Sequence, residues 1–345
     1  ILLFGLICFF ASNKYYMFTN QFGMRKTESR FSPLFMPSGA CDFLEQNDIK
    51  GRMFNTLDFG PYIGYRFYPE RRIFIDTRTD LYKDEFYSIY RRAQNYPLEW
   101  RQVQEKYNFN IALFRHLFSG TENLIKYLYN NKDWRLVYYD ENSCVFLKDV
   151  PEYRKLIDTF EINQKKRLQD RDININIAKF FQNIGALDLA EEIYIRLLEE
   201  DPKSLRAGNN LATIYINTGR FDEAEKLISR FLTYYPRSSE LYANMGIIYL
   251  RLEKKDQALL MLEKSAKLDP YLRQSSYMLG LVYLERGSID KAMRQFIKYS
   301  KLDPFNPEAH RILGDIYMQK GLLKKAEDEY NEADALEGKD VSVSQ

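Results

Sequence analysis

Two acidic side chains and one arginine alternate directly after an apolar run in the first half of the chain. Asp76, Arg78 and Asp80 follow the apolar residues 73–75. Functional sites in α/β proteins often lie where a strand ends, and a pair of nearby carboxylates could bind a cation. Arg78 lies between the two carboxylates, however, and could neutralise both. We therefore expect an Asp–Arg pair that fixes this loop, with Asp80 capping the helix that follows.

Other residue patterns that support catalysis are missing from the sequence. Gly60 and Gly64 belong to neither the dinucleotide-binding glycine motif nor a P-loop. His116 has no serine or cysteine near it in a nucleophile motif, so we interpret it as a partly buried histidine rather than a general base. The sequence therefore predicts no catalytic residue and no cofactor for this chain.

The cysteines also give no indication of a metal site. Cys8, Cys41 and Cys144 lie far apart without metal-binding spacing, and the chain has only 2 histidines. We interpret Cys41 and Cys144 as buried free thiols. A disulfide between them is the alternative if this part of the chain faces an oxidising compartment.

The charge balance argues against nucleic acid as a partner. The 345 residues include 50 basic and 48 acidic side chains, mixed throughout, for a formal net charge of +2. Nucleic-acid binding needs a concentrated positive field, which this mixture does not supply. Because one domain usually has ~100–200 residues, the length predicts two folded units.

The chain begins with an apolar run, residues 1–10, that is shorter than the ~20 residues needed to cross a bilayer. We interpret residues 1–12 as the end of a truncated transmembrane helix and residues 13–31 as a juxtamembrane segment. Tyr15, Tyr16 and Phe18 resemble an aromatic belt at a membrane interface. The alternative is a short hydrophobic helix packed on the domain. The expected localisation is therefore a membrane.

A period of 34 residues runs through the second half of the chain. Small residues and prolines recur in register: Ala224, Ala258, Ala292 and Ala326; Gly246, Gly280 and Gly314; Pro202, Pro236, Pro270 and Pro304. Small residues allow two antiparallel helices to approach closely, and each proline stops the second helix of a pair. The period therefore predicts a stack of helix pairs.

This register resembles the tetratricopeptide repeat (TPR), and the resemblance implies an all-α solenoid, an α–α superhelix, that binds a protein or peptide. The resemblance covers five units: 171–204, 205–238, 239–272, 273–306 and 307–340. Residues 341–345 are expected to be a polar tail.

Residues 32–149 predict a small α/β sheet domain, mainly parallel with an antiparallel edge, because helical and strand-like segments alternate there. Helices are expected at 36–47 and 83–95, and a strand, turn and helix over 51–62. Residues 150–170 are either a helical linker or an extra packing helix. Strands are expected at 72–76, 110–114, 135–139 and 144–148, with the last two forming a hairpin.

One set of residues carries a second resemblance. These residues are Gly51-Arg52-x-Phe54-Asn55, Gly60-Pro61-Tyr62, Tyr68-Pro69, Asp76-x-Arg78-x-Asp80-x-Tyr82, Trp100 and Trp134-x-x-Val137-Tyr138-x-Asp140. They resemble the soluble C-terminal domain of multi-pass bacterial membrane proteins similar to GT-C-type glycosyltransferases. The resemblance implies a bacterial inner-membrane protein whose soluble part is extracytoplasmic and whose catalytic loops precede Ile1. The basic residues Lys14, Arg25, Lys26 and Arg30 favour the cytoplasm instead.

In TPR proteins the first helices of the units line a concave groove. By this resemblance the partner-binding residues are Asn210, Thr213, Asn244, Ile247, Leu250, Tyr277, Leu281, Leu284 and Arg311. The clamp of Lys, Asn and Arg by which some TPR grooves hold a terminal carboxylate is absent. Asn210 and Asn244 either pair with the backbone of an extended peptide or hydrogen-bond within the array.

The expected function is a membrane-anchored adaptor that binds a partner protein or peptide in this groove. The alternative, implied by the second resemblance, is the non-catalytic C-terminal portion of a lipid-sugar-dependent membrane glycosyltransferase. A scaffold without any enzyme upstream is a further alternative.

Overall fold

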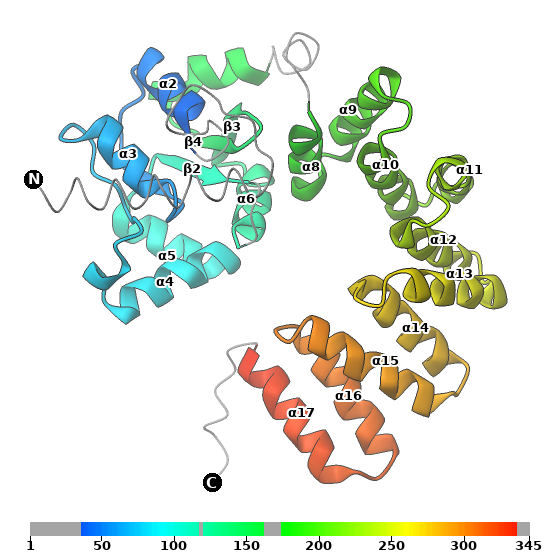
Figure 1. The fold of residues 1–345 in the computed structure, drawn as a ribbon. Coiled ribbons are helices and arrows are strands. Elements are labelled where there is room, and N and C mark those ends of the chain that lie inside the picture. Colours follow the sequence, from blue (N-terminus) through cyan, green and yellow to red (C-terminus); the bar gives the residue numbers. More distant parts are fainter. Residues whose placement is uncertain (1–35, 117–119, 162–173, 337–345) are drawn as a thin grey trace, which may run out of the picture. The chain divides into compact units, whose positions relative to one another are not determined.

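The computed structural model describes residues 36–116, 120–161 and 174–336 (Figure 1). The chain divides into two compact units, with the boundary in the sequence between Ile193 and Tyr194. The first unit contains a four-stranded sheet with helices around it. In its described residues, the second unit consists of paired helices.

The sheet of the first unit has the strand order β1-β2-β4-β3. β1 pairs with β2 in parallel, whereas the β2–β4 and β4–β3 pairs are antiparallel. The predicted small α/β sheet is confirmed, but the expectation of a mainly parallel sheet is wrong because the β3–β4 hairpin places β4 next to β2. The strands are β1 Met53–Asn55, β2 Ile111–Arg115, β3 Trp134–Tyr139 and β4 Ser143–Lys148.

The turn between β3 and β4 is held by Asp140, as the predicted hairpin requires. Its Oδ1 accepts hydrogen bonds from the backbone nitrogens of Asn142 (2.9 Å) and Ser143 (2.6 Å). Its Oδ2 accepts one from the hydroxyl of Tyr138 (2.7 Å). One carboxylate thus satisfies the backbone donors that a tight turn leaves unpaired.

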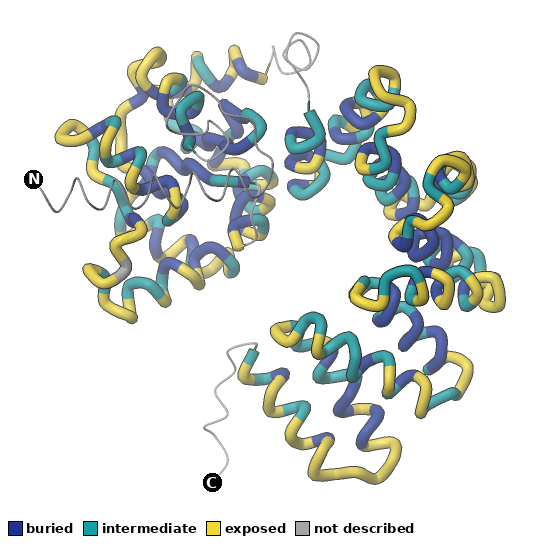
Figure 2. Tube along the Cα trace, viewed as in Figure 1, coloured by how far each residue is buried: buried dark blue, intermediate teal, exposed yellow. Residues whose placement is uncertain are grey.

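Among the described residues, the helices before the β3–β4 hairpin are α2 Ser38–Gln46, α3 Gly60–Phe67, α4 Asp84–Asn95, α5 Pro97–Tyr107 and α6 Glu122–Tyr129. The helices predicted at 36–47 and 83–95 are confirmed as α2 and α4, and the predicted strand, turn and helix as β1 and α3. Aromatic rings fill the core. The ring centroid of Phe54 on β1 lies 5.0 Å from that of Trp100 and 5.9 Å from that of Phe114. Figure 2 shows that the strands are buried almost throughout.

The segment 72–76 is not a strand, which corrects the prediction. The side chain of Asn55, at the end of β1, takes the place of a backbone ladder there. Its Nδ2 donates to the carbonyl of Ile75 (2.7 Å), and its Oδ1 accepts from the nitrogen of Phe74 (3.0 Å). An apolar run therefore lies beside the sheet edge without the regular pairing that defines a strand.

The charged segment after the sheet begins with η3, a short 3₁₀ helix at Pro151–Tyr153, and residues 154–161 are helical. Ile157 and Phe160 are buried, and the ring of Phe160 lies 6.1 Å from that of Tyr139. Of the two alternatives for residues 150–170, the described part matches an extra packing helix. Residues 162–173 lie outside the described part of the chain.

The paired helices follow the 34-residue register of the sequence. Each of the later pairs joins a first helix of thirteen residues to a second of fourteen, as in α12 and α13. The helices are α8 Ile175–Ile184, α9 Leu187–Glu200, α10 Leu205–Asn217, α11 Phe221–Tyr234, α12 Ser239–Arg251, α13 Lys255–Leu268, α14 Arg273–Glu285, α15 Ile289–Leu302, α16 Pro307–Gln319 and α17 Leu323–Leu336.

The small residues of the register lie where paired helices touch. A Cβ added at Gly280 would lie 2.6 Å from the ring of Phe296 on the second helix of the pair, and one at Gly246 would lie 2.6 Å from Leu262. Ala258 and Ala292 are completely buried. The sheet domain followed by an all-α repeat array is therefore the predicted fold class.

The predicted membrane localisation is contradicted: among the residues that the structure describes, no helix is both long enough and apolar enough to span a bilayer. The segments on which that prediction depended, residues 1–12 and 13–31, lie outside the described part of the chain.

Candidate functional site

The second unit has a hollow of about 550 Å³ on the side formed by its first helices. Residues of α10, α12 and α14 surround it, together with Gly219 in the turn after α10 and Phe221 at the start of α11. The lining residues are Thr213, Ile216, Asn217, Gly219, Phe221, Asn244, Ile247, Arg251, Gln274 and Met278. We call this the first-helix hollow.

A chain of side-chain amides crosses three consecutive first helices at the hollow. Asn244 Nδ2 donates to Asn209 Oδ1 (2.8 Å), and Gln274 Nε2 donates to Asn244 Oδ1 (3.2 Å). Asn244 is only 3% exposed, so its amide is fixed in one orientation by both neighbours. The sequence left two roles open for Asn244, and the structure shows it hydrogen-bonded within the array.

The rest of the hollow combines apolar side chains with one cation. Ile247 and Met278 are half-buried, and Ile216 is buried. Arg251 is the one charged residue of the lining. It is exposed, and it makes no ion pair or hydrogen bond with any residue that the structure describes. The hollow thus offers apolar contact area, amide groups and a single unpaired guanidinium.

Three other residues predicted for the groove are engaged inside the array. Asn210 hydrogen-bonds to the hydroxyl of Tyr194. The Tyr277 hydroxyl donates to Glu308 Oε1 (2.7 Å). Arg311 pairs with Asp334 of α17 at 3.1 Å.

The predicted apolar residues Leu250, Leu281 and Leu284 are partly buried and pack against the core between helix pairs. Of the nine predicted residues, Thr213, Asn244 and Ile247 are the ones that line the first-helix hollow. Whether any of the nine binds a partner stays a prediction.

The prediction missed several residues at the rim of the hollow. Asn217 and Arg251 are the last residues of α10 and α12, Gly219 lies in the turn after α10, and Phe221 begins α11. They lie beyond the helix positions by which TPR grooves are usually described. A residue comparison across the units would have singled out Arg251, since its counterparts in the other four units are Asn183, Asn217, Glu285 and Gln319.

The Asp76–Arg78 pair has the structural role that the sequence predicted. Asp76 Oδ2 accepts from Arg78 Nε (2.8 Å), and Oδ1 accepts from the Arg78 backbone nitrogen (3.0 Å) and the Tyr82 hydroxyl (3.3 Å). Burial raises the pKa of Asp76, but the hydrogen bonds and charge of Arg78 outweigh it, so the pKa is lowered overall. The carboxylate is therefore held ionised by its own loop.

Asp80 does not cap the following helix, which corrects the prediction. It lies in η2, a short 3₁₀ helix at Thr79–Leu81, and α4 begins at Asp84 with Lys83 at its N-cap. Among the described residues, no group of three or more His, Cys, Asp or Glu side chains could hold a metal ion.

His116, Cys41 and Cys144 are all buried. The two thiols are unpaired, as the preferred interpretation held, and burial raises the pKa of Cys41 to about 12.

His116 Nε2 lies 2.8 Å from the Asp140 carbonyl oxygen, so this nitrogen carries the proton. Burial lowers the pKa of His116 from 6.5 to about 4. Such a histidine is neutral at neutral pH, and it does not line the first-helix hollow.

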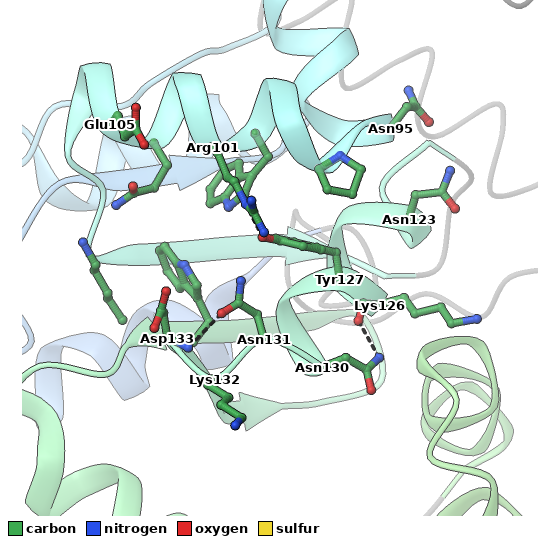
Figure 3. A pocket seen from close by; sticks show the side chains of 15 residues that line it. Asn95, Arg101, Glu105, Asn123, Lys126, Tyr127, Asn130, Asn131, Lys132 and Asp133 are labelled. Carbon is green, nitrogen blue, oxygen red and sulfur yellow. Dashed lines mark hydrogen bonds between the residues drawn. The ribbon is translucent and has the colours of Figure 1, made fainter.

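A second hollow, of about 970 Å³, lies in the first unit between α5, α6 and the start of β3 (Figure 3). Arg101 Nε donates to the Tyr127 hydroxyl (3.1 Å) across it. In Figure 3, Lys126 and Lys132 extend away from this pair. Its charged groups therefore do not converge on one point, and we regard the first-helix hollow as the better candidate site.

Comparison with known families identifies the helix pairs. Family models described as tetratricopeptide repeats match residues 185–245, 239–271 and 277–340. The helix pairs are tetratricopeptide repeats. Arrays of this repeat commonly present a concave surface to protein or peptide partners.

Solved structures of TPR proteins are similar to about half of this chain. The crystal structure of MamA is 26% identical, covers 48% of this chain and 98% of its own, and has a TM-score of 0.41. TTC0263, a thermophilic TPR protein of Thermus thermophilus, is 24% identical with coverage of 48% and 91% and a TM-score of 0.42. YrrB, described as a TPR protein with an unusual peptide-binding site, is 20% identical with coverage of 51% and 93% and a TM-score of 0.36.

No curated protein matches the chain significantly. The family and structure matches concern the repeats, and the predicted resemblance of the N-terminal half to GT-C-type glycosyltransferase proteins finds no support among them.

Proposed function

We propose that this protein is an adaptor that binds an extended segment of a partner protein in the first-helix hollow of its TPR array. The observation that carries the proposal is the hollow itself, which spans three first helices. Tetratricopeptide arrays bury their core between helix pairs, so a hollow on the first-helix side is surface available to a partner.

The lining suits a polypeptide better than a small metabolite. Ile216, Ile247 and Met278 supply apolar area, whereas a metabolite site usually encloses its ligand with several converging polar groups. The amide chain through Asn244 uses part of its hydrogen-bonding capacity internally, and an amide nitrogen has a second donor hydrogen for a partner's backbone carbonyl. Apolar anchoring with a few backbone hydrogen bonds is how extended segments bind.

The proposal can be tested with a matched pair of variants of the full chain. A random peptide library displayed on phage would be selected on the wild-type protein, and the enriched peptides measured against each variant. Ile247→Lys places a charge on the floor of the hollow. Leu260→Lys places the same charge at an exposed leucine of α13, a second helix.

We expect Ile247→Lys to abolish binding of the enriched peptides and Leu260→Lys to leave it unchanged. Circular dichroism on both variants verifies folding, and Met278→Lys is a second probe of the same floor. Equal binding by wild type, Ile247→Lys and Met278→Lys would show that the hollow is not the binding site.

A further inference from the structure

We infer that Arg251 is the specificity-determining residue of the first-helix hollow, and that the partner segment carries an aspartate or glutamate side chain between apolar residues. This inference rests on the proposed function and adds the chemistry of the partner. It starts from the charge of the site: among ten lining residues, Arg251 alone is charged.

Within the described part of the chain, no residue pairs with the Arg251 guanidinium. Two carboxylates of the neighbouring units already have partners: Glu285, at the equivalent position of the next unit, pairs with Lys255 at 2.9 Å, and Glu225 accepts from the Tyr249 hydroxyl at 2.9 Å. No described carboxylate lies within ion-pair distance of Arg251. An arginine presents its donors in a planar fork that fits one carboxylate with two parallel hydrogen bonds.

A purely structural role does not explain this arginine. A cation in the last turn of a helix interacts favourably with the helix dipole, and Arg251 is in that position in α12. However, the equivalent residues Asn183, Asn217, Glu285 and Gln319 are neutral or acidic, so the repeat does not need a cation there. Among these equivalent residues, Asn217 and Arg251 both line the first-helix hollow, and Arg251 is the one that brings a charge to it.

The surroundings of Arg251 select a side-chain carboxylate within a segment rather than a chain terminus. A terminal carboxylate is usually held by several donors that include more than one cation, and the other polar groups here are neutral: Thr213, Asn217, Asn244 and Gln274. Ile247 and Met278 provide apolar contacts for the residues on either side of the acid. The partner is therefore an internal acidic-apolar segment in an extended conformation.

The test uses the peptide selection described above on the full chain. We expect aspartate or glutamate to be enriched at one fixed position among peptides bound by wild type. Selection on Arg251→Glu should lose that enrichment. Selection on Arg237→Glu should keep the enrichment. Arg237 is an exposed arginine outside the hollow, and it pairs with no residue that the structure describes.

A thermodynamic cycle then assigns the contact. Replacing the acid of one enriched peptide by its amide should weaken binding to wild type by about tenfold or more, as expected for a charge-assisted pair. The same replacement should change binding to Arg251→Gln by less than about twofold, because the partner of the acid is already gone. Arg251→Lys should give an intermediate loss, since charge is kept and the planar fork is lost.

The outcomes separate this inference from the proposed function. If the enriched peptides need Ile247 but show no acidic preference, or if the acid-to-amide change weakens binding equally in wild type and Arg251→Gln, the role of Arg251 is wrong and the binding site stands. If no peptide depends on Ile247, or none is enriched, both proposals are wrong.

Discussion

The ring of Phe180 lies 4.6 Å from the imidazole ring of His116, so the first helix of the repeat region packs on the end of strand β2. Phe181 extends this contact, with its ring 5.0 Å from that of Tyr139 on β3. Asn174, the N-cap of α8, donates to Glu141 in the β3–β4 turn at 3.1 Å. By its contacts, α8 therefore belongs to the unit that contains the sheet, although by sequence it opens the first repeat.

This packing predicts how the stability of the protein depends on pH. The pKa of His116 is about 4 in the folded state, against 6.5 for an ordinary histidine, because the ring is buried. Between these values the unfolded chain binds a proton that the folded chain excludes, so stability falls as pH is lowered. The free energy of unfolding attributable to His116 falls by about 1.4 kcal/mol for each pH unit below 6.5. Above pH 6.5 the histidine is neutral in both the folded and the unfolded state, and it costs no stability.

Urea unfolding at a series of pH values checks this prediction. His116→Gln is the matched variant, because its amide nitrogen can donate to the Asp140 carbonyl but does not titrate. We expect the variant to be less sensitive to acid than wild type between about pH 6.5 and 4. Identical pH dependence of the two proteins would contradict a neutral, buried His116.

The repeats could be predicted from the sequence because each position recurs for a single physical reason. Gly246, Gly280 and Gly314 recur because paired helices approach too closely there for a side chain, and the structure places Leu262, Phe296 and Tyr330 against them. If the helix boundaries of one unit were assigned wrongly, its small residues would fall out of register with those of the other units. The hairpin was also predictable, since Asp140 is a turn residue between two apolar runs.

The parts that could not be predicted depend on contacts between distant residues. Segment 72–76 has the composition of a strand, but the amide of Asn55 replaces the backbone pairing, and nothing in the local sequence shows this. The Phe180–His116 contact joins residues that are far apart in the chain. Arg251 was missed for another reason: it lies outside the helix positions by which TPR grooves are usually described, although a comparison across the units shows it as the one cation at its position.

The helix-pair contact at Gly280 predicts a strong effect of added volume. Since even a Cβ would lie 2.6 Å from Phe296, Gly280→Leu forces the two helices apart. We expect a loss of about 1–3 kcal/mol or more in the free energy of unfolding. Glu285→Ala on the same helix removes only the exposed pair with Lys255 and should cost about 0–1 kcal/mol. Equal melting temperatures of the two variants would refute the assigned register.

The loop after residues 73–75 predicts unequal roles for its two aspartates. Asp76 has a side chain only 3% exposed and accepts hydrogen bonds from Arg78 and Tyr82, so Asp76→Asn should cost about 1–3 kcal/mol. Asp80 is exposed and does not cap α4, so Asp80→Asn should stay within about 0.5 kcal/mol of wild type. Thermal unfolding of the two variants measures the difference, and a larger effect at Asp80 would restore the capping role expected from the sequence.

The amide chain predicts that Asn244 stabilises the array itself. Asn244→Ala leaves Asn209 Oδ1 and Gln274 Nε2 without their partners, at a cost of about 1–3 kcal/mol. Asn217→Ala is the matched control, because Asn217 lines the same hollow but is exposed. Its side chain forms no hydrogen bond within the part of the chain that the structure describes. Chemical unfolding of both variants, monitored by circular dichroism, provides the comparison.

This comparison decides how a binding defect at Asn244 should be interpreted. If Asn244→Ala is less stable than Asn217→Ala, weaker peptide binding by the former reflects a rearranged hollow, and contacts with a partner must be assigned through Ile247 and Arg251 instead. If the two variants are equally stable, the amide chain contributes little to folding. Asn244 could then exchange its internal hydrogen bonds for those of a peptide backbone at little cost, and a binding defect of Asn244→Ala would report a direct contact.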